Sequence, residues 1–231
     1  MRSMTRDAEI EFASDARATR PVEYHELGGL AYVAKLVLDR LIAAVALVVL
    51  SIPMALIIIA IKATSPGPAF IKQERVGRFG RPFMFNKFRS MRVDAELIRE
   101  ELEDHNDHDL DVPLIFKMRQ DPRVTRIGSF LRRSSLDELP NLFNVLKGEM
   151  SIVGPRPPLP REVAHYDSYH MQRLATQPGI TGLWQVRGRC EIGFEEMVEI
   201  DLEYIRDWSL WNDAFIMLRT PLAVFGGKGA W

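Results

Sequence analysis

A long apolar run is the strongest pattern in the sequence. Residues 41–61 contain no charged side chain, and only Ser51 and Pro53 interrupt the apolar positions. A straight helix of that length measures about 31 Å, which is enough to cross the hydrocarbon core of a bilayer. The alternative is a buried core helix, although apolar runs of this length are uncommon in soluble domains.

The proline and the flanking charges predict how this segment lies in a membrane. Pro53 stands near the middle of the run, where it removes a backbone hydrogen bond and kinks the helix, and Ser51 can bond the freed carbonyl groups. Basic residues flank the run on both sides: Lys35, Arg40, Lys62 and Lys72. Because basic residues favour the cytoplasmic face, we expect a re-entrant helix over residues 29–64, with its break at Ser51 and Pro53. A plain span with a proline kink is the alternative.

Charge alternates in blocks after the apolar run. Residues 62–92 hold eight Lys or Arg against the single acid Glu74, and residues 94–112 hold nine acids against one Arg. Within the basic block, alternating aromatics on either side of a glycine-rich turn at 77–80 predict a β-hairpin. The acidic block predicts an exposed helix and a solvated loop. Its two histidines, His105 and His108, are too loosely spaced to favour a metal site over that loop.

Two apolar patterns close the chain. Residues 194–208 read as an amphipathic helix, with one face formed by Met197, Ile200, Tyr204, Ile205 and Trp208. A second apolar stretch follows over residues 211–225. Both patterns fit ordinary core packing, and both fit helices lying in a membrane interface, which the tryptophans favour.

Composition excludes few classes of function. The chain is 47% hydrophobic and 26% charged, with a formal net charge of −1. Its single cysteine, Cys190, rules out an intramolecular disulfide. No Walker A pattern, dinucleotide-binding glycine fingerprint or zinc spacing is present. Only the basic stretch over 113–189 would favour a nucleic-acid partner, and we expect none.

The candidate chemistry centres on residues 132–140. Ser135 followed by Glu138 has the spacing of a capping box, which predicts a helix through Lys147 that ends at Gly148. A simple helix start is the conservative interpretation. The alternative is phosphoryl chemistry, because a helix start attracts phosphate and two adjacent carboxylates follow this one. Asp137 or Glu138 would then attack phosphorus while the other holds a divalent metal.

Two further segments could contact phosphate groups. Arg156 is flanked by prolines, so its stiff backbone would present the guanidinium as a phosphate clamp. A proline-rich surface loop is the alternative. Residues 178–189 contain three glycines and two arginines and could hold a nucleotide diphosphate, or could be an ordinary connection.

At these residues the sequence resembles the bacterial sugar transferase family, the small monotopic polyprenyl-phosphate sugar-1-phosphate transferases. The resemblance runs from about Lys35 to the C-terminus and rests on many motifs in the same order. These motifs are residues 35–40, 65–68, Gln73, Arg75 and Gly77, and residues 87–91, 121–125, 135–139, 144–151, 153–157 and 178–189. Two departures are Ser90 in place of threonine and the separation of Ser51 from Pro53 by one residue.

The resemblance implies a Mg²⁺-dependent (or Mn²⁺-dependent) reaction through a covalent aspartyl-phosphosugar. It makes Asp137 the nucleophile and Glu138 the metal ligand beside it. Candidate substrate contacts are Lys87, Arg132, Arg156, Gln185, Arg187 and Arg189. The expected activity moves sugar-1-phosphate from a UDP-sugar, with glucose or galactose favoured, to polyprenyl (undecaprenyl) phosphate and releases UMP. This would be the first membrane step of exopolysaccharide, capsule or glycoconjugate synthesis.

The resulting expectation is a mostly helical α+β protein of the bacterial inner membrane. Residues 1–28 form a disordered tail, residues 29–64 the membrane-embedded helix, and residues 65–231 a catalytic domain on the cytoplasmic face. That domain would contain a small β-hairpin and interfacial amphipathic helices. Its partners would be the UDP-sugar, polyprenyl phosphate and membrane lipids, with a homo-oligomer possible. A non-catalytic membrane-anchored scaffold is the alternative.

Overall fold

A bent pair of helices occupies the apolar run, for which a helix broken at Ser51 and Pro53 was expected. The computed structural model describes residues 29–95, 98, 121–187 and 193–225. Helix α1 spans Leu30–Val49 and α2 spans Ser51–Thr64, and the two are bent by 61° at their junction. Among the described residues, no single helix passes the length and hydropathy criteria for crossing a membrane, whereas α1 and α2 pass them as a pair.

The break lies at Leu50, just ahead of the two residues expected to form it. Pro53 sits in the first turn of α2, where its missing N–H would have bonded the carbonyl of Val49. The α1 ladder therefore ends one turn before the proline. The Ser51 hydroxyl donates to the Val48 carbonyl at 2.7 Å, which confirms that it satisfies a carbonyl at the break.

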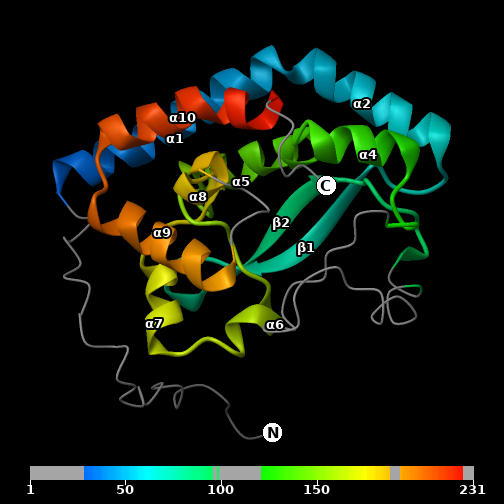
Figure 1. Ribbon diagram of the computed structural model, residues 1–231. Helices are drawn as coiled ribbons and strands as arrows, with labels where there is room; N and C mark the ends of the chain where they lie inside the picture. The colour runs from blue at the N-terminus through cyan, green and yellow to red at the C-terminus, as the bar shows by residue number, and fades with distance from the viewer. Residues whose placement is uncertain (1–28, 96–97, 99–120, 188–192, 226–231) are drawn as a thin grey trace, which may run out of the picture.

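One continuous apolar stripe faces outward along both helices. Its members recur every three or four residues across the bend, as one helix face requires. They are Val33, Val37, Leu41, Val45, Val48, Ile52, Leu56 and Ile59. Figure 1 shows α1, α2 and α10 (Leu210–Phe225) together along one side of the molecule, with the hairpin and the smaller helices beneath them.

The hairpin expected from the aromatic pattern is present. Strands β1 (Phe70–Val76) and β2 (Pro82–Phe88) pair antiparallel, and the turn between them uses positive φ at Phe79 and Gly80. Strand β2 buries Phe83, Phe85 and Phe88 against the rest of the domain. Phe83 and Phe85 lie on one face of the strand and Phe88 on the other, so both faces anchor the hairpin, and burial fixes its register.

A second, parallel strand pair was not expected from the sequence. Strand β3 (Ser151–Val153) pairs with β4 (Gly179–Thr181). The two backbone segments approach closely here: a Cβ added to Gly179 would lie 2.1 Å from the backbone nitrogen of Gly154. Only glycine permits this approach, so the loop after β3 is held against the start of β4.

Short helices connect these elements and complete the core. They are α4 (Arg126–Arg133), η4 (Leu136–Asn141), α5 (Leu142–Lys147), α6 (Pro160–Val163), α7 (Ser168–Met171), η5 (Gln172–Ala175), α8 (Leu183–Arg187) and α9 (Phe194–Arg206). The mostly helical α+β class is confirmed.

The two C-terminal helices behave differently. Helix α9 buries Ile200, Tyr204 and Ile205 of its expected face, so it packs as a core helix. Helix α10 instead exposes an apolar row of Trp211, Phe215, Leu218 and Leu222. Apart from Asp94, Ala95 and Ile98, the exposed helix expected in the acidic block lies outside the described residues, and so do its two histidines and the N-terminal tail.

Candidate active site

The segment that carries the two carboxylates is a tight turn of 3-10 helix. Ser135 has φ +55° and ψ +16°, and its side chain caps no helix. The capping box expected at Ser135 and Glu138 is therefore wrong, because a capping residue needs extended backbone and the Glu138 carboxylate bonds Lys87 instead. The expected end of the helix at Gly148, with φ +80°, is confirmed.

Four charged side chains from three separate elements converge at this turn. Lys87 of β2 places its Nζ 2.7 Å from Glu138 Oε1 and 3.7 Å from Asp137 Oδ2. Arg156, in the loop after β3, places Nη1 3.7 Å from the same Glu138 oxygen. Asp137 is only 6% exposed. The structure thus brings together residues up to 69 positions apart in sequence.

Burial and neighbouring charges separate the pKa values of the two carboxyl groups. Burial raises the pKa of Asp137; Lys87 opposes this effect, and the adjacent Glu138 adds to it. Burial also favours a higher pKa for Glu138, but Lys87 and Arg156 outweigh it and bring that pKa to about 2. Adjacent carboxylates held in different environments can take different roles.

Arg132 reaches the site from the end of α4. Its Nε donates to the Ser90 hydroxyl at 3.0 Å. Burial lowers the pKa of Arg132, while the negative charges of Asp137 and Asp121 oppose that shift. The serine that departs from the usual family motif thus supplies the hydroxyl that orients Arg132, and threonine would supply the same group.

The carboxylate pair fits a magnesium ion that also binds substrate phosphates. Among the described residues, no cluster of three or more His, Cys, Asp or Glu side chains forms a complete protein cage. Mg²⁺ commonly uses one or two carboxylates together with water and phosphate oxygens. Asp137 and Glu138 supply that partial set, and the surrounding cations suit a diphosphate.

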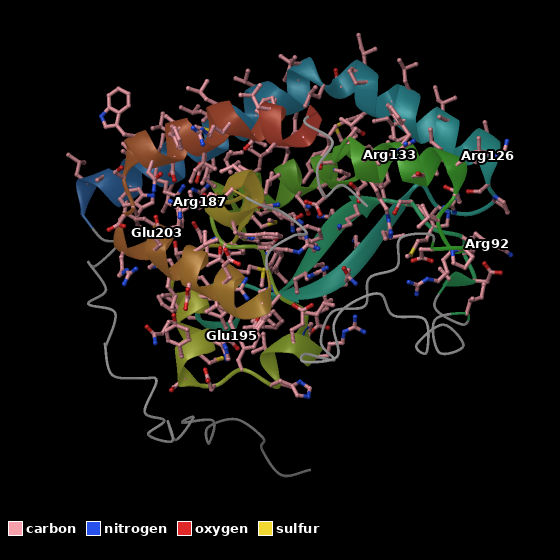
Figure 2. The ribbon with its side chains drawn as sticks, in the orientation of Figure 1. Arg92, Arg126, Arg133, Arg187, Glu195 and Glu203 are labelled. Carbon is pink, nitrogen blue, oxygen red and sulfur yellow. The ribbon has the colours of Figure 1, made fainter. Side chains whose placement is uncertain are left out.

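Of the remaining expected contacts, Gln185 and Arg187 are described, and neither forms a hydrogen bond or ion pair with Asp137 or Glu138. Arg187 pairs with Glu203 of α9 at 2.6 Å, and Figure 2 shows these two side chains between α8 and α9. Gln185 is half-buried, and its Oε1 has no hydrogen-bond partner among the described residues. Arg189 lies outside the described residues. Contacts from this segment to substrate therefore stay a prediction.

Two site residues were not recognised as such from sequence. Phe85 lies under the ammonium of Lys87, 5.2 Å from the ring centroid, and under the guanidinium of Arg75, at 5.5 Å. Arg75 is also buried. The hairpin pattern contained a usable signal, since Arg75, Phe85 and Lys87 alternate along paired strands and so share one face.

Sequence comparison relates the chain to a known protein family. Residues 30–227 match the profile of a family described as Bacterial sugar transferase. The chain belongs to the bacterial sugar transferase family. This match covers both carboxylates and every described element.

Several curated members of this family are similar in sequence. "Galactosyl transferase CpsE" of Streptococcus agalactiae is 53% identical over 165 residues, covering 71% of this chain and 36% of that protein. "UDP-glucose:undecaprenyl-phosphate glucose-1-phosphate transferase" of Xanthomonas campestris is 45% identical over 207 residues, covering 86% of this chain and 40% of that protein. "Exopolysaccharide production protein ExoY" of Rhizobium meliloti is 38% identical over the full length of both. The chain thus spans less than half of the first two relatives and all of the third.

Proposed function

We propose that this protein transfers a sugar-1-phosphate from a UDP-sugar to undecaprenyl phosphate, with Asp137 as the covalent nucleophile. The observation that carries the proposal is the buried Asp137 beside Glu138, with Lys87, Arg132 and Arg156 around them. The names of the relatives from Xanthomonas campestris and Streptococcus agalactiae support glucose or galactose as the sugar. The name of the full-length relative supports a role in exopolysaccharide production.

The reaction divides into two displacements at phosphorus. In the first, an Asp137 carboxylate oxygen attacks the β-phosphorus of the UDP-sugar, and the bond to the bridging oxygen breaks so that UMP leaves. In the second, a phosphate oxygen of undecaprenyl phosphate attacks the same phosphorus and frees the Asp137 carboxylate. Each step exchanges one P–O bond for another, so no oxidant or reductant is needed.

The side chains around Asp137 neutralise and place the diphosphate. Lys87 favours the ionised form of both adjacent carboxyl groups, and Arg156 offers a planar fork of donors to phosphate oxygens. Arg132 approaches from the end of α4, and its hydrogen bond to the Ser90 hydroxyl fixes its position. Bound at Glu138 and Asp137, Mg²⁺ (or Mn²⁺) would add charge neutralisation at the diphosphate.

The acceptor requires the site to lie at a membrane surface. The apolar stripe along α1 and α2, together with the exposed apolar row on α10, supports embedding of this side of the molecule. The 61° bend supports a re-entrant course, in which both ends of the pair leave by one face. We place that face on the cytoplasmic side of the inner membrane, where UDP-sugars are available.

Release of UMP tests the proposal directly. The full chain in lipid nanodiscs receives undecaprenyl phosphate, Mg²⁺ and a panel of UDP-sugars, and UMP is measured. We expect Asp137→Asn to abolish release and Glu138→Gln to lose most of it. Intact mass after donor alone should show one added hexose phosphate in the wild type and none in Asp137→Asn. Near-normal turnover by Asp137→Asn would sink the covalent mechanism, and inactivity with every donor would favour a scaffold.

A further inference from the structure

A buried arginine outside the proposed machinery lies behind the Arg156 loop. Arg75 of β1 is 6% exposed, although it belongs to a strand whose first five residues are exposed. Its Nη1 donates to the Pro157 carbonyl at 2.9 Å. Its Nε and Nη2 both donate to Gln73 Oε1, at 3.2 and 2.8 Å. Three hydrogen bonds and the ring of Phe85 therefore fix one guanidinium plane.

This guanidinium holds the residue that follows Arg156. The backbone N–H of Val76 donates to the Pro158 carbonyl at 3.0 Å. Strand β1 therefore donates hydrogen bonds to two successive carbonyls of the loop, those of Pro157 and Pro158. Pro155 and Pro157 restrict the backbone on either side of Arg156. The prolines stiffen the loop and the two hydrogen bonds attach it to β1. The loop backbone therefore has little freedom to change the distance between Arg156 and Glu138.

The hairpin thus controls both cations that face Glu138. Lys87 projects from β2 and contacts the carboxylate itself. Arg156 comes from a distant part of the chain, and its loop is bonded to β4 through Gly154 and Pro155 and to β1 through the two residues that follow Arg156. Lys87 and Arg75 lie over the same Phe85 ring, so one aromatic side chain supports the direct and the indirect contact.

We infer that Arg75 is a positioning residue that sets the placement of Arg156 for the diphosphate of the donor, an inference that rests on the proposed function. Burial and then the charge of Arg156 lower the pKa of Arg75 to about 10, so Arg75 remains a cation at neutral pH. Its role depends on a forked geometry that lysine cannot reproduce, because an ammonium is a single point donor.

The test is a double-mutant cycle between Arg75 and Arg156. Arg75→Lys, Arg156→Gln and the double variant are compared for kcat/KM of UMP release and for equilibrium binding of UDP with Mg²⁺. Arg78→Lys is the matched control, because Arg78 lies on the same hairpin and also donates to a backbone carbonyl, that of Ala175, away from the carboxylates. Melting temperatures are measured for every variant.

We expect Arg75→Lys to lower kcat/KM about tenfold in the wild-type background and less than about twofold in the Arg156→Gln background. UDP binding should weaken with the same dependence on Arg156. The Arg78→Lys control should change each quantity less than about twofold in both backgrounds. A change in stability alone would lower activity equally in both backgrounds.

A milder pair of variants covers the case in which Arg75→Lys does not fold. Gln73 is exposed, so it tolerates substitution, and its Oε1 orients Arg75. Gln73→Leu removes that acceptor and should reproduce the Arg156-dependent loss in smaller degree. Gln73→Glu keeps an acceptor and should restore near wild-type values.

The outcomes separate this inference from the proposed function. Equal losses in both backgrounds, or no loss from either Arg75→Lys or Gln73→Leu, would overturn the positioning role while wild-type turnover still supports the transferase. Coupled effects on UDP binding without UMP release from any donor would retain the positioning role and reject the transferase. A wild-type protein that neither binds UDP nor releases UMP would overturn both.

Discussion

Replacing Lys87 by methionine should move the acid side of the pH–activity profile to higher pH. The substitution keeps an apolar chain over Phe85 and removes only the ammonium group. In the wild type this ammonium lies 2.7 Å from Glu138 Oε1 and 3.7 Å from Asp137 Oδ2, and all three side chains are at most 15% exposed. The proposed mechanism requires an ionised Asp137, and losing the cation raises the pKa of this carboxyl group, so the acid limb moves to higher pH.

The distances give the size of the effect. Two unit charges about 4 Å apart interact by about 4 kcal/mol at an effective dielectric constant near 20. One pKa unit corresponds to about 1.4 kcal/mol, so this interaction bounds the shift at roughly three units. Arg132 and Arg156 also lower the pKa of Asp137 and remain in the variant. We therefore expect the apparent acid pKa of kcat/KM to rise by about one to two units.

The assay is UMP release across a pH series, with Lys87→Arg as the control. Lys87→Arg retains the positive charge, so its acid limb should stay close to that of the wild type even if its rate falls. Lys87→Met should lose most activity at low pH and regain part of it as pH rises, because Asp137 then ionises without the ammonium. A uniform loss at every pH in Lys87→Met would refute the argument that Lys87 controls this ionisation.

Three other predictions concern the phosphate clamp, the membrane segment and the core. Arg156→Lys should lower kcat/KM for UMP release by more than about threefold, because lysine lacks the planar fork; a smaller loss would make it a surface residue. Ser51→Ala with Pro53→Leu should straighten the bent helices, move part of the N-termini across the membrane and lower activity. A membrane-impermeant thiol reagent and a cysteine in the N-terminal tail report on which side of the membrane the tail lies. Labelling of that cysteine from outside the cell, with Ser51 and Pro53 intact, would reject the re-entrant course. Arg173→Met should lower the free energy of unfolding in denaturant by about 3–5 kcal/mol, since it strands buried Asp201, and adding Asp201→Asn should recover part of that loss; an unchanged stability would contradict a paired role.

Local pattern was sufficient for several elements of this protein. The apolar run with its proline predicted a broken helix, because proline removes a ladder bond wherever the helix packs. Alternating aromatics around glycines predicted the hairpin, because strands alternate their faces. The ordered motifs identified the family, and they predicted Asp137 and Glu138 as the nucleophile and the metal ligand. Each of these inferences depends on residues that are close in sequence.

Other features depended on groups that are distant in sequence. The capping interpretation failed because Lys87, 51 residues earlier, takes the Glu138 carboxylate. The break moved to Leu50, and its 61° angle depends on how both helices pack. The parallel pairing of β3 with β4 depends on the close approach of the backbone at Gly154 and Gly179. The sequence pattern of two three-residue strands does not predict this approach.

The active-site arrangement therefore divides between sequence and tertiary structure. The sequence alone predicted which side chains would carry the chemistry, since their types and order are local properties. The tertiary structure decided that Lys87, Arg132 and Arg156 surround the carboxylates, which side chains are buried, and in which direction the pKa of each carboxyl group moves. Electrostatic interactions depend on distance and on exclusion of water. Both are set only when the hairpin, the 3-10 turn and the Arg156 loop pack together.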